Sequence, residues 1–120
     1  VMIHDSQRPL TQQAQFERVY AALTADIDAI RPVSPFTETL KSIDAHDFIY
    51  ETIDRTSMMR ISTPELIRAS AIDLTADTST WFVPLIDSAK TSVVDADPDS
   101  ARINSEKEIE LMSYLLDWNK

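Results

Sequence analysis

Residues 11–30, TQQAQFERVYAALTADIDAI, carry the most regular apolar pattern in the chain. The apolar side chains of this stretch recur at spacings of four, three, four and three residues: Phe16, Tyr20, Leu23, Ile27 and Ile30. Such spacing places all of them on one face of an α-helix, because the helix turns once every ~3.6 residues. We therefore predict one amphipathic helix over this stretch.

The segments that follow contain residues typical of helix starts. Ser34-Pro35 provides an N-cap followed by proline in the first turn, and residues 62–65 place a hydroxyl three positions before a carboxylate, as in a capping box. Pro84 begins another apolar run, and a last helix is expected to start near Pro98 or Ser105 and to continue to the carboxyl terminus. These signals predict several short helices with short connections.

The chain contains no glycine. Glycine adopts positive φ without a steric penalty, and two-residue β-hairpins need that conformation in their turns. Only two asparagines, Asn104 and Asn119, are present as substitutes. The absence argues against β-hairpins, and it also removes glycine-dependent phosphate loops and nucleophile elbows. The expected fold is all-α, a compact bundle of five or six short helices without a sheet.

Length and composition indicate one folded unit. With 120 residues, 43% of them hydrophobic, the chain can bury one core. We expect a single helical domain over residues 1–120 with a flexible amino terminus at about residues 1–10. No apolar stretch approaches the ~20 residues of a membrane span, and the first residues do not resemble a secretory signal, so the expected location is cytoplasmic without membrane contact. Because cysteine is absent, disulfides and thiolate metal sites are excluded.

The charge balance is strongly acidic. Asp and Glu number 20 against 11 Lys and Arg, which gives a formal net charge of −9. This charge repels nucleic-acid phosphates and anionic lipids, whereas it attracts a basic protein surface. The expected partner is therefore another protein, and direct binding of nucleic acid is not expected.

One acidic stretch matches the spacing of a calcium-binding EF-hand loop. Carboxylates occupy its positions one, three, five and twelve: Asp95, Asp97, Asp99 and Glu106. Ser100 stands where such a loop requires glycine, and Pro98 stiffens its middle. Because Asp97-Pro98-Asp99 is also a strong helix start, we favour that interpretation and no metal or cofactor is expected.

Other combinations of polar residues do not predict catalysis. His46 lies near several carboxylates but has no second imidazole at ligand spacing, so it is interpreted as a solvent-facing side chain. Residues 4–6, His-Asp-Ser, contain the residue types of a hydrolase triad, but triad members converge from separate elements. Carboxylates two positions apart on a helix, such as Asp26 and Asp28 or Glu106, Glu108 and Glu110, diverge by about 200°. We therefore expect no enzyme.

The carboxyl-terminal segment has an unusually broad apolar surface. On a helix its apolar side chains cover ~220° of the circumference, more than the stripe of an ordinary surface helix: Ile109, Leu111, Met112, Tyr114, Leu115, Leu116 and Trp118. Either this helix lies at the centre of the bundle or it also packs against a second chain. Trp81 and Phe82 form a second candidate interface patch, since aromatic residues are enriched at interface anchors.

These features lead to a hypothesis about function. The leading one is a small acidic, non-enzymatic regulatory or adaptor protein that binds another protein through helix faces and forms a homodimer. An inhibitor or antiactivator that sequesters a larger factor, such as a transcription regulator, is one form of it. The alternative is an acidic nucleic-acid mimic that blocks a DNA-binding protein, and a calcium-responsive module is third.

Overall fold

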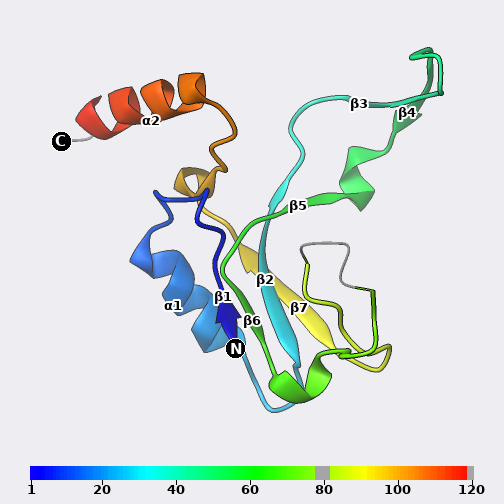
Figure 1. The fold of residues 1–120 in the computed structure, drawn as a ribbon, viewed down its shortest axis with the longest axis vertical. Coiled ribbons are helices and arrows are strands. Elements are labelled where there is room, and N and C mark those ends of the chain that lie inside the picture. Colours follow the sequence, from blue (N-terminus) through cyan, green and yellow to red (C-terminus); the bar gives the residue numbers. More distant parts are fainter. Residues whose placement is uncertain (78–81, 119–120) are drawn as a thin grey trace.

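The computed structural model describes residues 1–77 and 82–118, and its centre is a mixed β-sheet (Figure 1). The sheet contains five strands: β1 (Met2–Ile3), β2 (Ala29–Pro35), β5 (Met59–Ile61), β6 (Glu65–Ile67) and β7 (Thr91–Asp95). Two α-helices accompany it, α1 (Gln13–Ala22) and α2 (Glu106–Trp118). The prediction of an all-α bundle without a sheet is therefore wrong. That residues 1–120 form one domain stays a prediction.

Strand β2 is the centre of the sheet. It pairs in parallel with β7 on one side, and on the other it pairs antiparallel with β6 near its start and with β5 near its end. β1 pairs antiparallel with β6. Because β2 has neighbours on both sides, Ile30 lies opposite Leu66 and opposite Ser92, and it is fully buried.

The hydrophobic core lies between α1 and this sheet. α1 packs against β2, β6 and β7. Val19 of α1 meets Ile30 of β2 and Leu66 of β6 in one cluster. Partly buried apolar residues surround that cluster: Ala22, Leu23, Ile27 and Val94.

The predicted helix over residues 11–30 is only half right. α1 ends at Ala22, Leu23 follows it in an extended conformation, and Ile30 belongs to β2. Tyr20, placed on the predicted buried face, is 72% exposed. The helical spacing of apolar residues continues past the end of α1 by coincidence. Ile30 is buried because β2 is paired on both sides, and not because it lies on the buried face of a helix.

A β-hairpin forms in spite of the missing glycine. Strands β3 (Leu40–Ile43) and β4 (Ile49–Ile53) pair antiparallel and project away from the sheet at the upper right of Figure 1. The Asp44 carboxylate accepts hydrogen bonds from the backbone N–H groups of His46 and Phe48, at 2.8 and 3.1 Å. Asp47 adopts the left-handed region, with φ of 64°. The helix expected here was wrong because aspartate also tolerates this conformation, and a longer turn needs it only once.

Two further predicted helix starts are also wrong. Ser62 and Thr63 lead into β6 instead, and Glu65 forms an ion pair with Arg31 of β2 at 2.8 Å. Pro84 precedes a loop that is tied by a single bridge between Ile72 and Leu85. The hydroxyl-to-carboxylate pattern of a capping box was present, but its side chains bond to other segments rather than to a helix terminus.

Apart from α1, the helical elements of the described residues are three short 3-10 turns and the longer helix α2. Single 3-10 turns occur at η1 (Arg55–Ser57), η2 (Ala69–Ala71) and η3 (Pro98–Ser100). The helix expected at the carboxyl end is present as α2, but none of its residues is buried. Within the described ranges, neither α-helix has the length and apolar character needed to span a bilayer.

Candidate anion-binding site

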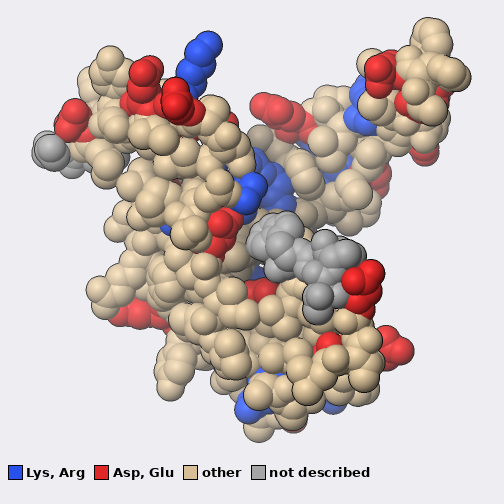
Figure 2. Space-filling view, viewed as in Figure 1, with Lys and Arg blue, Asp and Glu red and all other residues tan. Residues whose placement is uncertain are grey.

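Three arginines from distant parts of the chain gather at one end of the sheet. Arg8 follows β1, Arg60 belongs to β5, and Arg102 lies between η3 and α2. We call them the arginine cluster. They are close enough that Arg60 and Arg102 both act electrostatically on Arg8. Figure 2 shows basic side chains in the hollow between α2 and the β3–β4 hairpin, whereas acidic side chains are spread over the outer surface.

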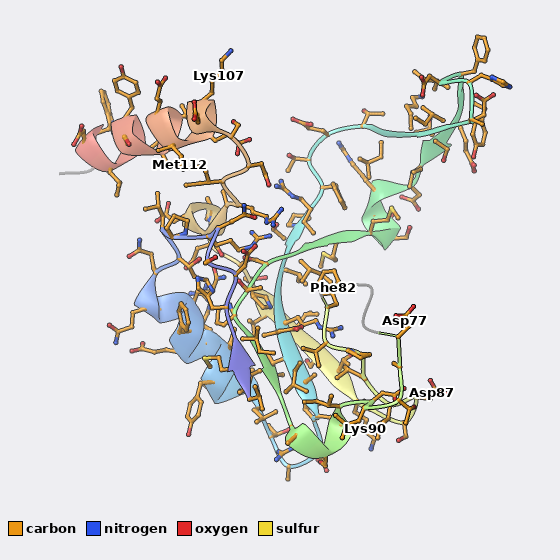
Figure 3. All side chains as sticks on the ribbon, in the orientation of Figure 1. Asp77, Phe82, Asp87, Lys90, Lys107 and Met112 are labelled. Atoms are coloured by element: carbon orange, nitrogen blue, oxygen red, sulfur yellow. The ribbon has the colours of Figure 1, made fainter. Side chains whose placement is uncertain are left out.

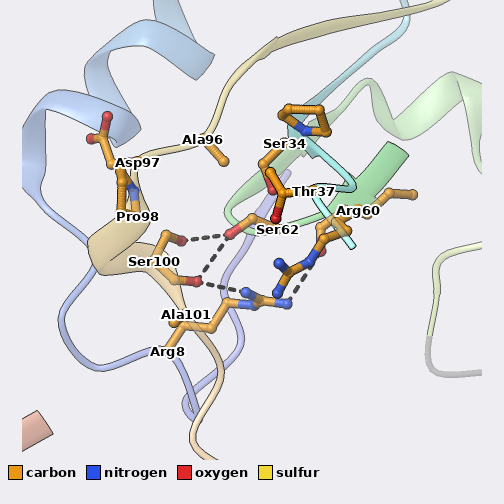
Figure 4. A pocket seen from close by; sticks show the side chains of 12 residues that line it. Arg8, Ser34, Thr37, Arg60, Ser62, Ala96, Asp97, Pro98, Ser100 and Ala101 are labelled. Atoms are coloured by element: carbon orange, nitrogen blue, oxygen red, sulfur yellow. Dashed lines mark hydrogen bonds between the residues drawn. The ribbon is translucent and has the colours of Figure 1, made fainter. Parts of the chain in front are cut away.

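A cavity of about 470 Å³ lies beside this cluster (Figure 4). Its walls come from the loop after β1, the ends of β2 and β5, and η3. The polar part of its lining comprises Arg8, Ser34, Thr37, Arg60, Ser62, Asp97 and Ser100. The cavity therefore combines cationic and hydroxyl donors in a chain whose net charge is −9.

Arg8 is held in place by backbone carbonyls. Its Nη1 donates to the carbonyl oxygen of Ser100 at 2.6 Å, and its Nη2 donates to that of Ile61 at 3.2 Å. These bonds fasten the end of β5 to η3 and fix the plane of the guanidinium. The buried Nε atom has no hydrogen-bond acceptor among the described residues and lies 3.6 Å from Oδ2 of Asp5. Arg8 thus keeps unused donor capacity, since a guanidinium carries five N–H groups.

A buried hydrogen-bond network supports the floor of the cavity. Gln15 of α1 is fully buried, and its Nε2 donates to the Thr63 carbonyl and to the Ser100 hydroxyl, both at 2.9 Å. Its Oε1 accepts the backbone N–H of Asp97 at 2.6 Å. The hydroxyls of Ser62 and Ser100 also bond to each other. One side chain therefore fixes α1, the segment between β5 and β6, and η3 relative to one another.

Asp5 is the carboxylate that accompanies the arginine cluster. It accepts a hydrogen bond from the Gln7 backbone N–H at 3.0 Å and one from Nε of Arg102 at 3.0 Å. Burial acts to raise the pKa of Asp5, but the hydrogen bond from Gln7 and the contact with Arg102 outweigh it and hold the pKa below its ordinary value. Burial is also the largest cause that lowers the pKa of Arg8, and Asp5 opposes this effect. Asp5 thus stays ionised at neutral pH.

The lowered pKa predicts how Asp5→Asn will change the pH dependence of stability. Because the folded-state pKa of Asp5 lies below its ordinary 3.8, its contribution is fully present above that value. The contribution is lost as the pH falls through the folded-state pKa. The difference in unfolding free energy between wild type and Asp5→Asn should therefore be constant from pH 7 to 5 and shrink below pH 4, measured by urea denaturation.

The matched control for this measurement is Asp26→Asn, which removes the same charge from an exposed carboxylate in the turn between α1 and β2. Its unfolding free energy should follow that of wild type across the whole pH range. A constant difference for Asp5→Asn down to pH 3 would contradict the assigned role of Asp5.

The arrangement can bind an anion of phosphate size. Four guanidinium groups, those of Arg8, Arg18, Arg60 and Arg102, accompany two carboxylates, those of Asp5 and Asp97, so the positive charges outnumber the negative ones. In the described part of the chain, the Arg60 guanidinium has no hydrogen bond or ion pair of its own, which leaves its donors available at the cavity. Guanidinium groups bind phosphate and carboxylate oxygens in pairs of parallel hydrogen bonds.

The candidate calcium ligands do not come together. Asp97 forms an ion pair with Arg18 at 2.8 Å, while Asp95 ends β7 and Glu106 begins α2. Across residues 1–77 and 82–118, no group of three or more His, Asp or Glu residues is arranged to hold a metal ion. The calcium-responsive module receives no support from this geometry.

The two histidines lie in different environments. His46 is exposed in the β3–β4 turn. His4 and Asp5, which were set aside because of their adjacency, lie beside the arginine cluster: Nε2 of His4 lies 3.2 Å from the Arg8 carbonyl oxygen, and Asp5 contacts Arg8 and Arg102. These two residues stabilise the loop after β1 and do not form a catalytic triad.

The two predicted interface patches lie apart. The apolar residues of α2 are exposed, except for the half-buried Met112, and Trp118 is 87% exposed. Figure 3 places Met112 on α2 and Phe82 in the segment that precedes β7, well separated in the molecule. Trp81 lies outside the described residues. That α2 contacts another polypeptide stays a prediction, whereas a place for α2 at the centre of a bundle is wrong.

Sequence reasoning missed the arginine cluster. Positions 8, 60 and 102 are far apart in the chain, and an overall charge of −9 conceals a local positive site. One signal was available, because arginine outnumbers lysine seven to four and arginine is favoured where phosphate is bound. That signal does not say which arginines meet.

A mixed sheet with an arginine-lined cavity at one end defines an α/β protein with a candidate anion-binding site. The sequence profile of the family described as "IspD: 2-C-methyl-D-erythritol 4-phosphate cytidylyltransferase" matches residues 1–104. The chain belongs to this family.

Individual relatives agree with the family assignment. The 2-C-methyl-D-erythritol 4-phosphate cytidylyltransferase of Nocardia farcinica is 30% identical over 122 residues, which cover 97% of this chain and 53% of that protein. The crystal structure of 4-diphosphocytidyl-2C-methyl-D-erythritol synthase from Anaerococcus prevotii matches with a TM-score of 0.71 at 22% identity, covering 98% of this chain and 56% of the other. The cytidylyltransferase structure from Thermus thermophilus matches with a TM-score of 0.67 at 19% identity, covering 98% and 61%.

These comparisons correct the functional hypothesis. The family is one of enzymes, so the prediction of a non-enzymatic regulatory or adaptor protein is wrong, and so are its inhibitor and antiactivator forms. The nucleic-acid mimic is likewise not supported. The chain spans 53% of the Nocardia farcinica protein and 56% of the Anaerococcus prevotii protein, about half the length of each.

Proposed function

We propose that this chain supplies the acceptor-binding part of a 2-C-methyl-D-erythritol 4-phosphate cytidylyltransferase. The observation that carries the proposal is the arginine cluster beside a cavity of about 470 Å³ in an otherwise acidic chain. The names of the relatives specify an acceptor that carries a phosphate and a cytidylyl group that is transferred. In this proposal the arginine cluster binds the phosphate of the acceptor.

The chemistry requires such a cluster. Transfer of a cytidylyl group forms a bond between a phosphate oxygen of the acceptor and the phosphorus of the cytidylyl group. The bond from that phosphorus to the oxygen of the donor's leaving group breaks, and the leaving group departs with that electron pair. Two anionic groups must therefore approach each other. Fixed guanidinium groups offset this repulsion, and they do so more strongly in a cavity than in water. Arg8 is preorganised by its bonds to two carbonyls, and Arg60 supplies donors with no internal partner in the described structure.

Arg60→Ala should weaken binding of 2-C-methyl-D-erythritol 4-phosphate by at least about tenfold, the equivalent of ~1.4 kcal/mol, because a charge-assisted contact to phosphate is lost. Isothermal titration calorimetry of the full chain measures this change. The thermal midpoint should barely move, since the Arg60 guanidinium makes no ion pair or hydrogen bond within the described residues.

The control is Lys90→Ala, which removes one positive charge at the opposite end of the sheet (Figure 3). This variant should bind as wild type does. The same affinity for wild type and Arg60→Ala would contradict the assignment of the phosphate to this cavity.

The proposal also includes the contact of α2 with a second polypeptide, which the sequence analysis predicted. We propose that the chain self-associates, supported by the exposed apolar side chains of α2, among them Leu111, Tyr114 and Trp118. We also propose a cytoplasmic location, which is consistent with membership of this enzyme family. Light scattering of wild type and Trp118→Ser tests the association: a monomeric wild type would contradict it.

A further inference from the structure

His4 links two backbone segments next to the arginine cluster. Its Nδ1 lies 3.0 Å from the hydroxyl of Thr63, and its Nε2 lies 3.2 Å from the carbonyl oxygen of Arg8. The imidazole also packs against the ring of Phe16, with 5.0 Å between the ring centroids and 55° between the planes. Three segments therefore meet at this side chain: the loop after β1, α1, and the segment that enters β6.

The hydrogen-bond partners determine which nitrogen carries the proton. The Arg8 carbonyl oxygen can only accept, so Nε2 of His4 is the donor of that bond. The Thr63 hydroxyl oxygen already accepts the backbone N–H of Asp5 at 3.0 Å, so its own proton is available for donation to Nδ1 of His4. All of these groups are satisfied at once by a neutral imidazole that is protonated on Nε2.

The resulting chain of bonds begins and ends on one turn. It runs from the Asp5 N–H through Thr63 and His4 to the Arg8 carbonyl, and the backbone N–H of Arg8 donates back to the Asp5 carbonyl at 3.0 Å. This turn carries the Asp5 carboxylate and the Arg8 guanidinium. The Thr11 hydroxyl also donates to the Arg8 carbonyl at 2.9 Å, which adds a second support at that end.

We propose that His4 is a positioning residue: its neutral imidazole fixes the Asp5–Arg8 turn and thereby the orientation of the Arg8 guanidinium toward a bound phosphate. This inference rests on the proposed function only for the identity of the ligand. The geometry of the turn itself is a property of the free chain, so the two proposals can fail separately.

The test of binding uses two variants and inorganic phosphate as the probe. His4→Phe keeps a ring against Phe16 and removes both hydrogen bonds, whereas His4→Gln restores an amide donor near the Nε2 position. We expect phosphate to bind His4→Phe about tenfold more weakly than wild type by calorimetry, ~1.4 kcal/mol, with the loss partly restored in His4→Gln.

If His4 only stabilised the fold, the substitutions would lower stability, but phosphate affinity would not decrease in the order wild type, His4→Gln, His4→Phe. Thermal midpoints are therefore measured for both variants. His4→Phe keeps the ring contact with Phe16 and His4→Gln keeps a hydrogen-bond donor, so we expect the two to unfold within a few degrees of each other. Equal phosphate affinity in wild type and His4→Phe would overturn the proposal, as would a loss in His4→Phe that His4→Gln does not restore.

A second measurement needs no ligand. Nitrogen-15 NMR of the imidazole at neutral pH should show a neutral ring protonated on Nε2, and the Arg8 Nε–H signal should shift in His4→Phe. A ring protonated on Nδ1, or an unchanged Arg8 signal, would overturn the positioning role. If wild type binds no phosphate while these signals behave as expected, the proposed function fails and the role of His4 in the turn stands.

Discussion

Ile30→Ala should lower the free energy of unfolding by about 3 kcal/mol, within the ~2–5 kcal/mol typical of large-to-small substitutions in a core. Ile30 is fully buried at the centre of β2, where it contacts Val19 of α1 and Leu66 of β6. The strands on both sides of β2 prevent the backbone from closing the cavity that alanine leaves. Urea denaturation followed by circular dichroism measures the change.

Ile49→Ala is the matched control, because the same atoms are removed from β4, where Ile49 is 67% exposed. Its effect should stay within about 0.5 kcal/mol, as for most surface substitutions. A loss below about 1 kcal/mol for Ile30→Ala would mean that the sheet relaxes around this position. That outcome would contradict the role of β2 as the rigid centre of the fold.

Gln15→Leu should cost a similar amount, about 3 kcal/mol, for a different reason. Leucine has nearly the volume of glutamine, so the cost comes from hydrogen bonds and not from a cavity. The substitution leaves the Asp97 N–H without its partner, and the Thr63 carbonyl keeps only the longer bond from the Ser100 hydroxyl, at 3.4 Å. Burying an unsatisfied polar group costs ~1–3 kcal/mol. The loss should be visible in urea denaturation, together with faster hydrogen exchange at Asp97.

Gln12→Leu is the control for this substitution, since Gln12 is exposed just before α1 and bonds only locally, to the Leu10 carbonyl. It should change the unfolding free energy by less than about 0.5 kcal/mol. Ser100→Ala should add less in the Gln15→Leu background than in wild type, because the two side chains share one network. Simple additivity would show that Gln15 and Ser100 act independently.

The β3–β4 hairpin shows why the absence of glycine was not sufficient to exclude β-hairpins. Missing glycine does remove glycine-built phosphate loops, and none of the 120 residues is glycine. It does not remove hairpins, because Asp44 caps the β3–β4 turn with its carboxylate and Asp47 takes the left-handed conformation. The missing consideration was the capacity of aspartate to substitute for both functions of glycine in a turn.

The strands of the sheet were missed for a related reason. β2 and β6 are buried on both faces or nearly so, and therefore they lack the alternation of apolar and polar residues that identifies a strand. In a short apolar run, a buried strand and one turn of a buried helix look alike. Pairing with β7 and β5, which are distant in sequence, decides between them.

By itself the sequence determined the properties that depend on local order or on sums over residues. The acidic charge, the absence of thiol chemistry, a helix beginning near Gln13 and a helix ending the chain all follow from it. Tertiary structure alone decided the sheet and the site. Arg8, Arg60 and Arg102 meet only because β5 pairs with the end of β2 while the Arg8 side chain fastens β5 to η3. A cationic site inside an acidic chain is a property of distances between residues, and no count along the sequence contains those distances.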